Sequence, residues 1–178
     1  AAAILARLDE RGAVLAIDRD PEAVAAGRAL LGADPRFTIV HAPFSTLLAC
    51  VRATGRQADG ILIDLGAGVE KPVRYLSALA QRTIVVTNDE PTSLTDAYAT
   101  IKVLVGQQQR QTVRVIINQA TRPGSGAAIT NQLQQVLDRF VVTGLNQPIR
   151  LIHMGDIPID PEVRQAIMRR QLMMQATP

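Results

Sequence analysis

The chain has 178 residues, of which 47% are hydrophobic and 20% are charged. This length supplies one well-buried core and is too short for two comfortable ones, so we expect a single domain over residues 1–178. The net charge of +3 comes from dispersed arginines, which permits an RNA or phosphate ligand without arguing for one. The sequence has no signal peptide and no apolar run of about 20 residues, so we expect no membrane-spanning helix.

Cys50 is the single cysteine and lies in the apolar helical run TLLACV. A lone cysteine forms no intrachain disulfide, which fits a reducing compartment and a cytoplasmic location. The sequence opens on AAAILARLDERG, a helical pattern without an initiating Met, from which we expect that something upstream has been cut away.

Apolar, β-branched runs of strand length alternate along the chain with amphipathic segments of helix length. Continuous apolar runs are typical of parallel strands covered on both faces. We therefore predict an α/β fold, a three-layer αβα sandwich with a mostly parallel sheet of about six strands and a Rossmann-like or P-loop-like hybrid character. The predicted strands are 13–18, 37–41, 60–65, 83–88, 112–118 and 149–155. The predicted helices are 2–10, 21–31, 45–54, 69–80, 92–107, 125–140 and 161–172.

Local signals mark several of these boundaries. Asp20 before Pro21 and Asp160 before Pro161 combine a capping carboxylate with a proline at the first helical position, and Ser45 precedes TLLACV. The strand predicted at 60–65 should lie near the centre of the sheet, with Ile61 and Ile63 buried.

Ligands of parallel α/β sheets bind beyond the carboxyl ends of the strands. Each polar residue there also has an ordinary role as a helix cap or turn residue, so a functional interpretation needs a pattern of several residues. The candidates are Asp18, His41 to Phe44, Asp64 to Gly68, Asn88 to Glu90, Asn118 to Thr121 and Gly155 to Asp160.

The first third of the chain carries AIDRDPEA, DPRF, FS and DGILIDLG in this order. In residues and spacing, positions 1–66 resemble the cytosine methyltransferases that act on the exocyclic amine of a small-subunit ribosomal RNA base with S-adenosylmethionine. The resemblance implies that Asp18 binds the ribose hydroxyls, Phe44 packs beside the adenosine and Asp64 is a cofactor-contacting acid. A carboxylate at a strand end can accept both hydroxyls of a ribose.

Two departures from that family weaken the functional inference. Its first strand and glycine-rich loop would precede Ala1, and where the family continues after DLG with a serine-rich segment this sequence has AGVEKP. The amino-acid end of the cofactor would therefore lack its cradle, and the RNA-binding half is not in the sequence.

The rest of the chain carries LIDLGAGVEKP, TNDEPTSLTDAYATIKVL, VRVIINQA and GDIPIDPEVRQAIMRRQ. Over residues 61–174 these segments resemble the Min/Par-type P-loop ATPases, most closely the branch that controls flagellar number. The resemblance implies that Asp64 is the Walker B acid near Mg²⁺, that Asn118 reads the adenine edge, and that Pro158 and Asp160 flank the base.

The phosphate cradle of those ATPases, G-x-x-x-x-G-K-[ST] or the form with two lysines, occurs nowhere in the 178 residues. Without backbone amides and a lysine around the phosphates, ATP hydrolysis lacks its charge-stabilising groups. Two weaker matches, GAGVEK at 66–71 and PGSGAAI at 123–129, are interpreted as turns.

Both resemblances include a strand that ends in aspartate and a glycine turn, and they meet at GILIDLGAG. We interpret the chain as an engineered chimera, with residues 1–66 derived from a methyltransferase and residues 67–178 from a P-loop ATPase, made to test fragment exchange between the two folds. We expect no catalytic residue, no metal and no resident cofactor, with S-adenosylmethionine and ATP as weak vestigial ligands. We expect no nucleic-acid or membrane partner, and self-association through an incompletely filled sheet stays open.

Two other functions remain open. The chain is an S-adenosylmethionine-dependent RNA methyltransferase if an upstream strand and glycine loop exist. Alternatively it is a nucleotide-binding or partner-binding module of the ATPase type, with the helix predicted at 92–107 as a surface for the partner.

Overall fold

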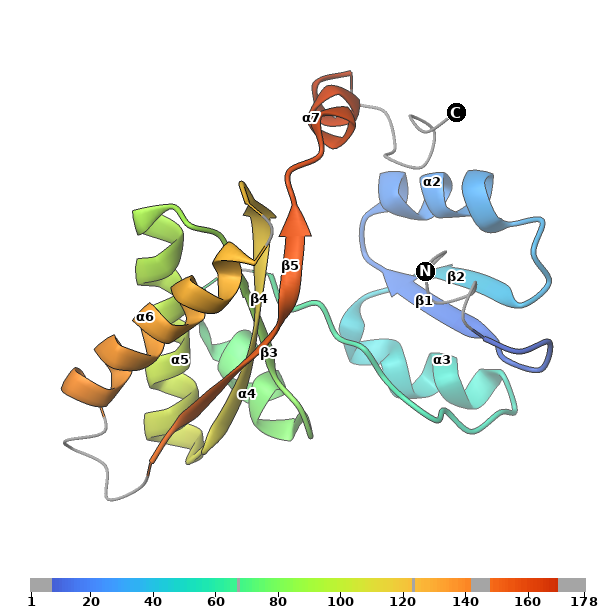
Figure 1. Cartoon of the computed structure of the whole chain (residues 1–178). Helices are drawn as coiled ribbons and strands as arrows, with labels where there is room; N and C mark the ends of the chain where they lie inside the picture. The colour runs from blue at the N-terminus through green and yellow to red at the C-terminus, as the bar shows by residue number, and fades with distance from the viewer. Residues whose placement is uncertain (1–7, 67, 123, 142–147, 170–178) are drawn as a thin grey trace. The chain divides into compact units, whose positions relative to one another are not determined.

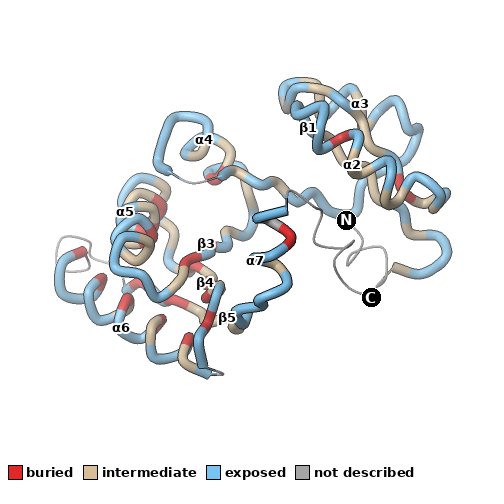
Figure 2. Tube along the Cα trace, turned by 90° about the horizontal axis from the view of Figure 1, so that it is seen from above, coloured by how far each residue is buried: buried red, intermediate tan, exposed pale blue. Residues whose placement is uncertain are grey.

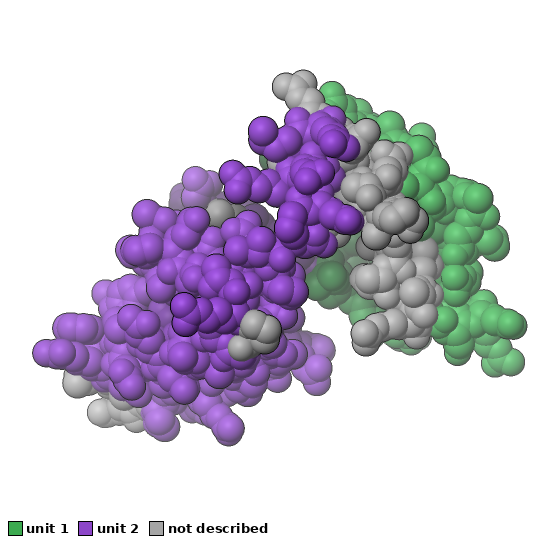
Figure 3. All heavy atoms as spheres, turned by 45° about the horizontal axis from the view of Figure 1, so that its top comes forward, with its two compact units in different colours: residues 1–62 green, residues 63–178 purple. Residues whose placement is uncertain are grey.

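The computed structural model describes residues 8–66, 68–122, 124–141 and 148–169 (Figure 1). The chain divides into two compact units, residues 1–62 and residues 63–178, which Figure 3 colours separately. The boundary between the units lies inside GILIDLGAG, the stretch where the two sequence resemblances meet. The single domain over residues 1–178 stays a prediction.

The first unit contains a parallel two-stranded sheet with helices beside it. Strand β1 (Val14–Asp18) pairs with β2 (Phe37–His41), and the helices are α2 (Pro21–Leu31), the 3₁₀ turn η1 (Phe44–Thr46) and α3 (Leu47–Ala53). The predicted strands at 13–18 and 37–41 are thereby confirmed. In the part of this unit that the structure describes, the buried apolar side chains are Val24 and Phe37, so its core is small.

The helix starts of the first unit follow local capping chemistry in one case and depart from it in another. The Asp20 side chain accepts a hydrogen bond from the Glu22 amide at 2.9 Å, and Pro21 is the first residue of α2, as the sequence predicts. Helix α3 begins at Leu47 after η1, so the predicted helix start at Ser45 is wrong. No side chain among the described residues caps the start of α3, and the Thr46 hydroxyl donates a hydrogen bond to the Pro43 carbonyl. Most of the helix predicted at 2–10 falls outside the described residues.

The second unit contains a parallel three-stranded sheet in the order β3 (Ile84–Thr87), β4 (Thr112–Ala120) and β5 (Arg150–Pro158). Its helices are α4 (Lys71–Leu79), α5 (Pro91–Gln108), α6 (Ser125–Phe140) and α7 (Pro161–Met168). Helices α5 and α6 cover one face of the sheet, and α4 packs against α5 (Figure 1). The predicted strands at 83–88, 112–118 and 149–155 are confirmed, with β4 and β5 each extending further.

The core of the second unit lies between the sheet and these two helices (Figure 2). Buried and half-buried residues alternate along β4, as expected for a strand with one face against a core. The buried apolar set includes Ile101, Leu104 and Val105 of α5, Leu133 and Leu137 of α6, and Val113, Val115 and Ile117 of β4. On β3 the side chains of Ile84 and Val86 remain exposed, so the strands are not covered on both faces by the described residues.

The prediction of one sheet of about six strands is wrong, because the described residues form five strands in two separate sheets. The missing member is the predicted central strand at 60–65, which is irregular. Of the two residues predicted to be buried, Ile61 is 55% exposed and Ile63 is half-buried, and Leu62 between them is 81% exposed. An apolar run becomes a strand only when a neighbour completes its ladder of backbone hydrogen bonds, and here no strand of either sheet pairs with it.

Candidate functional site

Asp18 and His41 lie opposite each other at the carboxyl ends of β1 and β2, in the register that the parallel pairing sets. One oxygen of the exposed Asp18 carboxylate accepts the Asp20 amide at 2.9 Å, and His41 Nε2 lies 3.1 Å from the Arg19 carbonyl. The structure thus places Asp18 at a strand end, as predicted, but engages it in its own turn. Phe44 begins η1, and its side chain lies outside what the structure describes.

Asp64 is the candidate that both resemblances share, and it does not lie at the end of a strand. It is exposed in the irregular stretch, and its carboxylate accepts the Gly66 amide at 3.0 Å. Gly66 has a φ of +68°, a conformation that glycine adopts without strain, so the two residues form a local turn. Nothing among the described residues holds this carboxylate toward the other candidates.

Asn118, Pro158 and Asp160 come together at the carboxyl edge of the second sheet. Pro158 pairs with Ala120, whose carbonyl accepts the Ile159 amide at 3.2 Å, and this pairing brings the end of β5 beside the end of β4. The Asn118 side chain accepts the following amide at 3.0 Å, and Asp160 accepts the Glu162 amide at 2.8 Å at the start of α7. Neighbouring parallel strands therefore bring these three residues to the same edge, where the Asn118 and Asp160 side chains each accept a local hydrogen bond.

The carboxylate of Asp156, within the candidate range Gly155 to Asp160, lies close to this edge and has a structural role. Asp156 of β5 accepts the amides of Gly124 at 3.0 Å and Gly126 at 3.2 Å, the first amides of α6. Its second oxygen lies 2.7 Å from His153 Nε2. Because a helix N-terminus is a natural anion site, the Asp156 carboxylate occupies the position that a phosphate would take at PGSGAAI. The interpretation of that segment as a turn is wrong from Ser125 onward, because α6 begins there.

The electrostatics of Asp156 follow from these contacts. Its side chain is 12% exposed, and this desolvation acts to raise the pKa of the carboxyl. The hydrogen bonds from His153, Gly126 and Gly124 outweigh the desolvation, so the pKa lies below its ordinary value. Gly126 has no room for a side chain, since a Cβ there would collide with the Asp156 carboxyl and would lie 2.8 Å from His153 Nε2.

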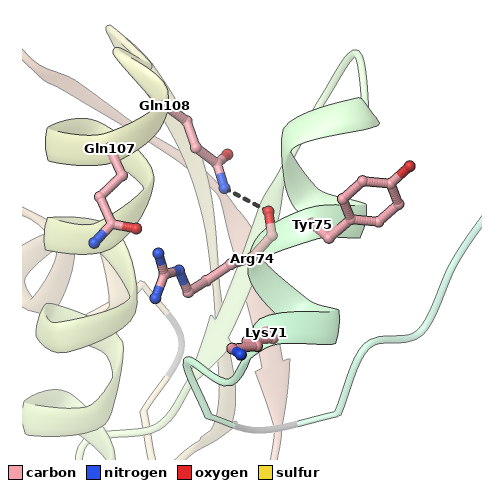
Figure 4. Close-up of a pocket in the computed structure, with 5 residues that line it drawn as sticks. All are labelled: Lys71, Arg74, Tyr75, Gln107 and Gln108. Carbon is pink, nitrogen blue, oxygen red and sulfur yellow. Dashed lines mark hydrogen bonds between the residues drawn. The ribbon is translucent and has the colours of Figure 1, made fainter.

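A network of side-chain hydrogen bonds joins the end of α5 to the carbonyl groups of α4. Gln108 Nε2 donates to the Arg74 carbonyl at 2.9 Å and to the Ser77 hydroxyl at 2.8 Å. Arg110 donates to the carbonyls of Ser77, Ala78, Ala80 and Gln81, which lie at the C-terminal end of α4. Figure 4 shows the Gln108 contact beside a hollow between the two helices.

The described residues offer neither a metal site nor a membrane-spanning helix. They contain no group of three or more His, Cys, Asp or Glu side chains that could hold a metal ion. Within the same ranges, no helix is both long enough and apolar enough to cross a membrane.

Comparison with known proteins identifies relatives of two kinds. Residues 1–72 match the sequence family described as the MraW methylase family. The ribosomal RNA small subunit methyltransferase H of Azoarcus sp. is 52% identical over 65 residues, which are 36% of this chain and 20% of that protein. The same enzyme of Alcanivorax borkumensis is 47% identical over 64 residues, again 20% of its length.

The antiactivator FleN of Pseudomonas aeruginosa is 35% identical over 120 residues, which are 67% of this chain and 41% of FleN. The chain therefore spans well under half of each of these proteins. An alignment of 65 residues and one of 120 residues cannot fit side by side in 178, so part of the chain resembles both relatives. This overlap is expected if GILIDLGAG belongs to both patterns. The two resemblances are thereby confirmed: an N-terminal segment is related to the MraW methylases and another segment to FleN, as in a chimera of two parts.

Proposed function

We propose that this chain is an engineered α/β scaffold that joins a methyltransferase-derived part, residues 1–66, to a P-loop-ATPase-derived part, residues 67–178. It serves to test fragment exchange between the two folds and catalyses neither methyl transfer nor ATP hydrolysis. The position of the junction supports this proposal, because the two parental patterns share it instead of following one another as separate domains. Here the two resemblances overlap within one apolar stretch.

The observation that carries the proposal is the position of Asp64. Both parental chemistries need this carboxylate fixed at a strand end, in one case beside a cofactor and in the other beside Mg²⁺. The carboxylate is instead exposed in an irregular segment and accepts the amide of its own turn. Catalytic groups act through fixed geometry, and a misplacement of about 1 Å can cost a hundredfold in rate. A carboxylate on an unpaired segment does not meet that requirement.

Turnover assays test the proposal. For the 178-residue polypeptide, we expect ATP hydrolysis and methylation of small-subunit ribosomal RNA at the level of a buffer blank, because neither phosphate nor sulfonium is positioned. Asp64→Ala should change neither rate. The matched control is Asp59→Ala, which removes another exposed carboxylate from the same irregular stretch. Turnover above the blank that Asp64→Ala abolishes and Asp59→Ala preserves would contradict the proposal and favour an S-adenosylmethionine-dependent methyltransferase or an ATPase.

A second candidate function is nucleotide binding without catalysis, and the gathering of Asn118, Pro158 and Asp160 at one sheet edge favours it. These residues offer polar groups for a base but supply no cation for the phosphates. Each missing neutral hydrogen bond costs roughly 0.5–1.5 kcal/mol, and charged ones cost more.

We therefore expect that neither ATP nor S-adenosylmethionine binds more tightly than about millimolar. Titration calorimetry with each ligand measures this. A micromolar ATP affinity lost in Asn118→Ala, or a micromolar S-adenosylmethionine affinity lost in Asp18→Ala, would show that one parental site survives.

A further inference from the structure

The hollow between α4 and α5 is lined in part by two cationic side chains, Lys71 and Arg74, that have no role described above. It measures about 360 Å³, is largely open to solvent, and belongs entirely to the second unit. Its lining residues are Lys71, Arg74, Tyr75, Gln107 and Gln108. Figure 4 shows the Arg74 guanidinium extending from α4 toward the Gln107 carboxamide of α5, with Lys71 one turn away and the Tyr75 ring directed elsewhere.

The two cations at this hollow have no ion-pair partner among the described residues. Lys71 and Arg74 are exposed, lie three positions apart and so share one side of α4. Neither side chain forms a hydrogen bond or an ion pair within the described ranges. The first turn of α4 contains no acidic residue, although the positive end of the helix dipole lies there, and the N-cap residue before it is Glu70. With two cations and one neighbouring carboxylate, this end of the helix carries a net positive charge that favours an anion.

Hydrogen bonds between α4 and the end of α5 hold the two sides of the hollow in place, which lowers the free-energy cost of ordering them around a ligand. Gln108 is held by two hydrogen bonds to α4, and Arg110 binds the last carbonyls of that helix. These contacts use the backbone of Arg74 and leave its guanidinium available. A guanidinium matches two oxygens of a phosphate at once, and an ammonium adds a compact second charge.

We propose that this hollow binds a small phosphate-bearing ligand, held by Arg74 and Lys71 with the Gln107 amide as a further donor. A small ligand fits better than an acidic protein, because the lining side chains come from two neighbouring helices around a hollow of about 360 Å³. This proposal does not depend on the proposed function. Phosphate binding here would neither require nor imply catalysis.

The test is a titration of the whole chain with inorganic phosphate at pH 7, followed by amide NMR shifts, with sodium chloride at matched ionic strength as the reference. We expect saturable, phosphate-specific shifts in α4 and in the Gln107 side chain with a millimolar dissociation constant. The double variant Lys71→Gln/Arg74→Gln should weaken binding at least tenfold. Arg74→Lys keeps the charge but loses the planar guanidinium, so its phosphate affinity should lie between those of the wild type and the double variant.

The matched control is Lys102→Gln, which removes an exposed lysine of α5 that does not line the hollow. It should leave phosphate affinity unchanged, and unchanged thermal midpoints should show that all variants fold. Equal affinity in the wild type and the double variant would overturn the proposal, as would identical shifts with chloride. Binding of polyglutamate without binding of phosphate would overturn it in favour of an acidic polypeptide.

Discussion

Replacing Leu137 by alanine should lower the free energy of unfolding of the unit formed by residues 63–178 by about 2–5 kcal/mol. Leu137 is 0% exposed and belongs to the cluster between α6, α5 and β4. Truncating it removes buried apolar surface and leaves a cavity that neighbours on a helix and a sheet fill only in part. No larger effect is expected from any other single change considered for this protein.

Urea denaturation followed by tyrosine fluorescence measures this loss. The chain has two tyrosines and no tryptophan, and both Tyr75 and Tyr98 lie in the second unit, so the signal reports on that unit. Tyr98 packs against the same core.

The matched control is Val136→Ala, one position earlier on α6. Val136 is partly exposed, and alanine has the higher helix propensity, so this change should stay within about 0.5–1 kcal/mol. If Leu137→Ala cost no more than Val136→Ala, the core assigned here would be wrong. If Leu137→Ala lowered the slope of the unfolding free energy against urea concentration, the substitution would have changed the compactness of the unfolded or the folded state.

Local signals in the sequence were sufficient for most elements of the fold. Strand β2 was predicted with its observed ends, and α2 begins where Asp20 and Pro21 indicate. These features depend on residues within a few positions of one another. The chain itself carries that information, because capping and the length of an apolar run are local properties.

The segment at 60–65 shows why the number of strands could not be predicted in the same way. Its composition is that of a buried strand, with Ile61 and Ile63 on one side and Leu62 on the other. Strand formation depends on a partner that lies elsewhere in the chain, and neither sheet provides one. The position of Asp64 could not be predicted for the same reason, because its expected role depended on the strand predicted at 60–65.

The candidate residues at the second sheet were predictable because parallel strands end at one edge, so Asn118 and Pro158 had to come close. The capping role of Asp156 could not be predicted from proximity, because it lies 30 positions from the Gly126 amide. The sequence does contain one indication that α6 needs a cap from another part of the chain. The helix after Pro123 begins with Gly124, Ser125 and Gly126, and without a side-chain cap of its own it needs an acceptor from elsewhere.

Asp156→Ala is expected to lower the thermal midpoint of the second unit by several degrees. The change leaves the Gly124 and Gly126 amides and the His153 ring without their acceptor, and the loss is most costly at Gly126, which is buried. Circular dichroism or tyrosine fluorescence during heating measures the midpoint. Asp96→Asn is the control, since Asp96 is an exposed carboxylate of α5 without a hydrogen bond among the described residues, and its midpoint should match the wild type.

The effect of Asp156 should also depend on pH in a defined direction. Because the pKa of this carboxyl is lowered by folding, its ionised form stabilises the folded state at every pH above the ordinary value of 3.8. The contribution disappears as the pH falls through the lower pKa of the folded state, where the carboxylate takes up its proton. The gap in thermal midpoint between the wild type and Asp156→Asn should therefore be present at pH 5 and should narrow below pH 4. A gap that widened on acidification would mean that the protonated carboxyl is the form that holds α6, contrary to the hydrogen bonds it accepts from Gly124 and Gly126.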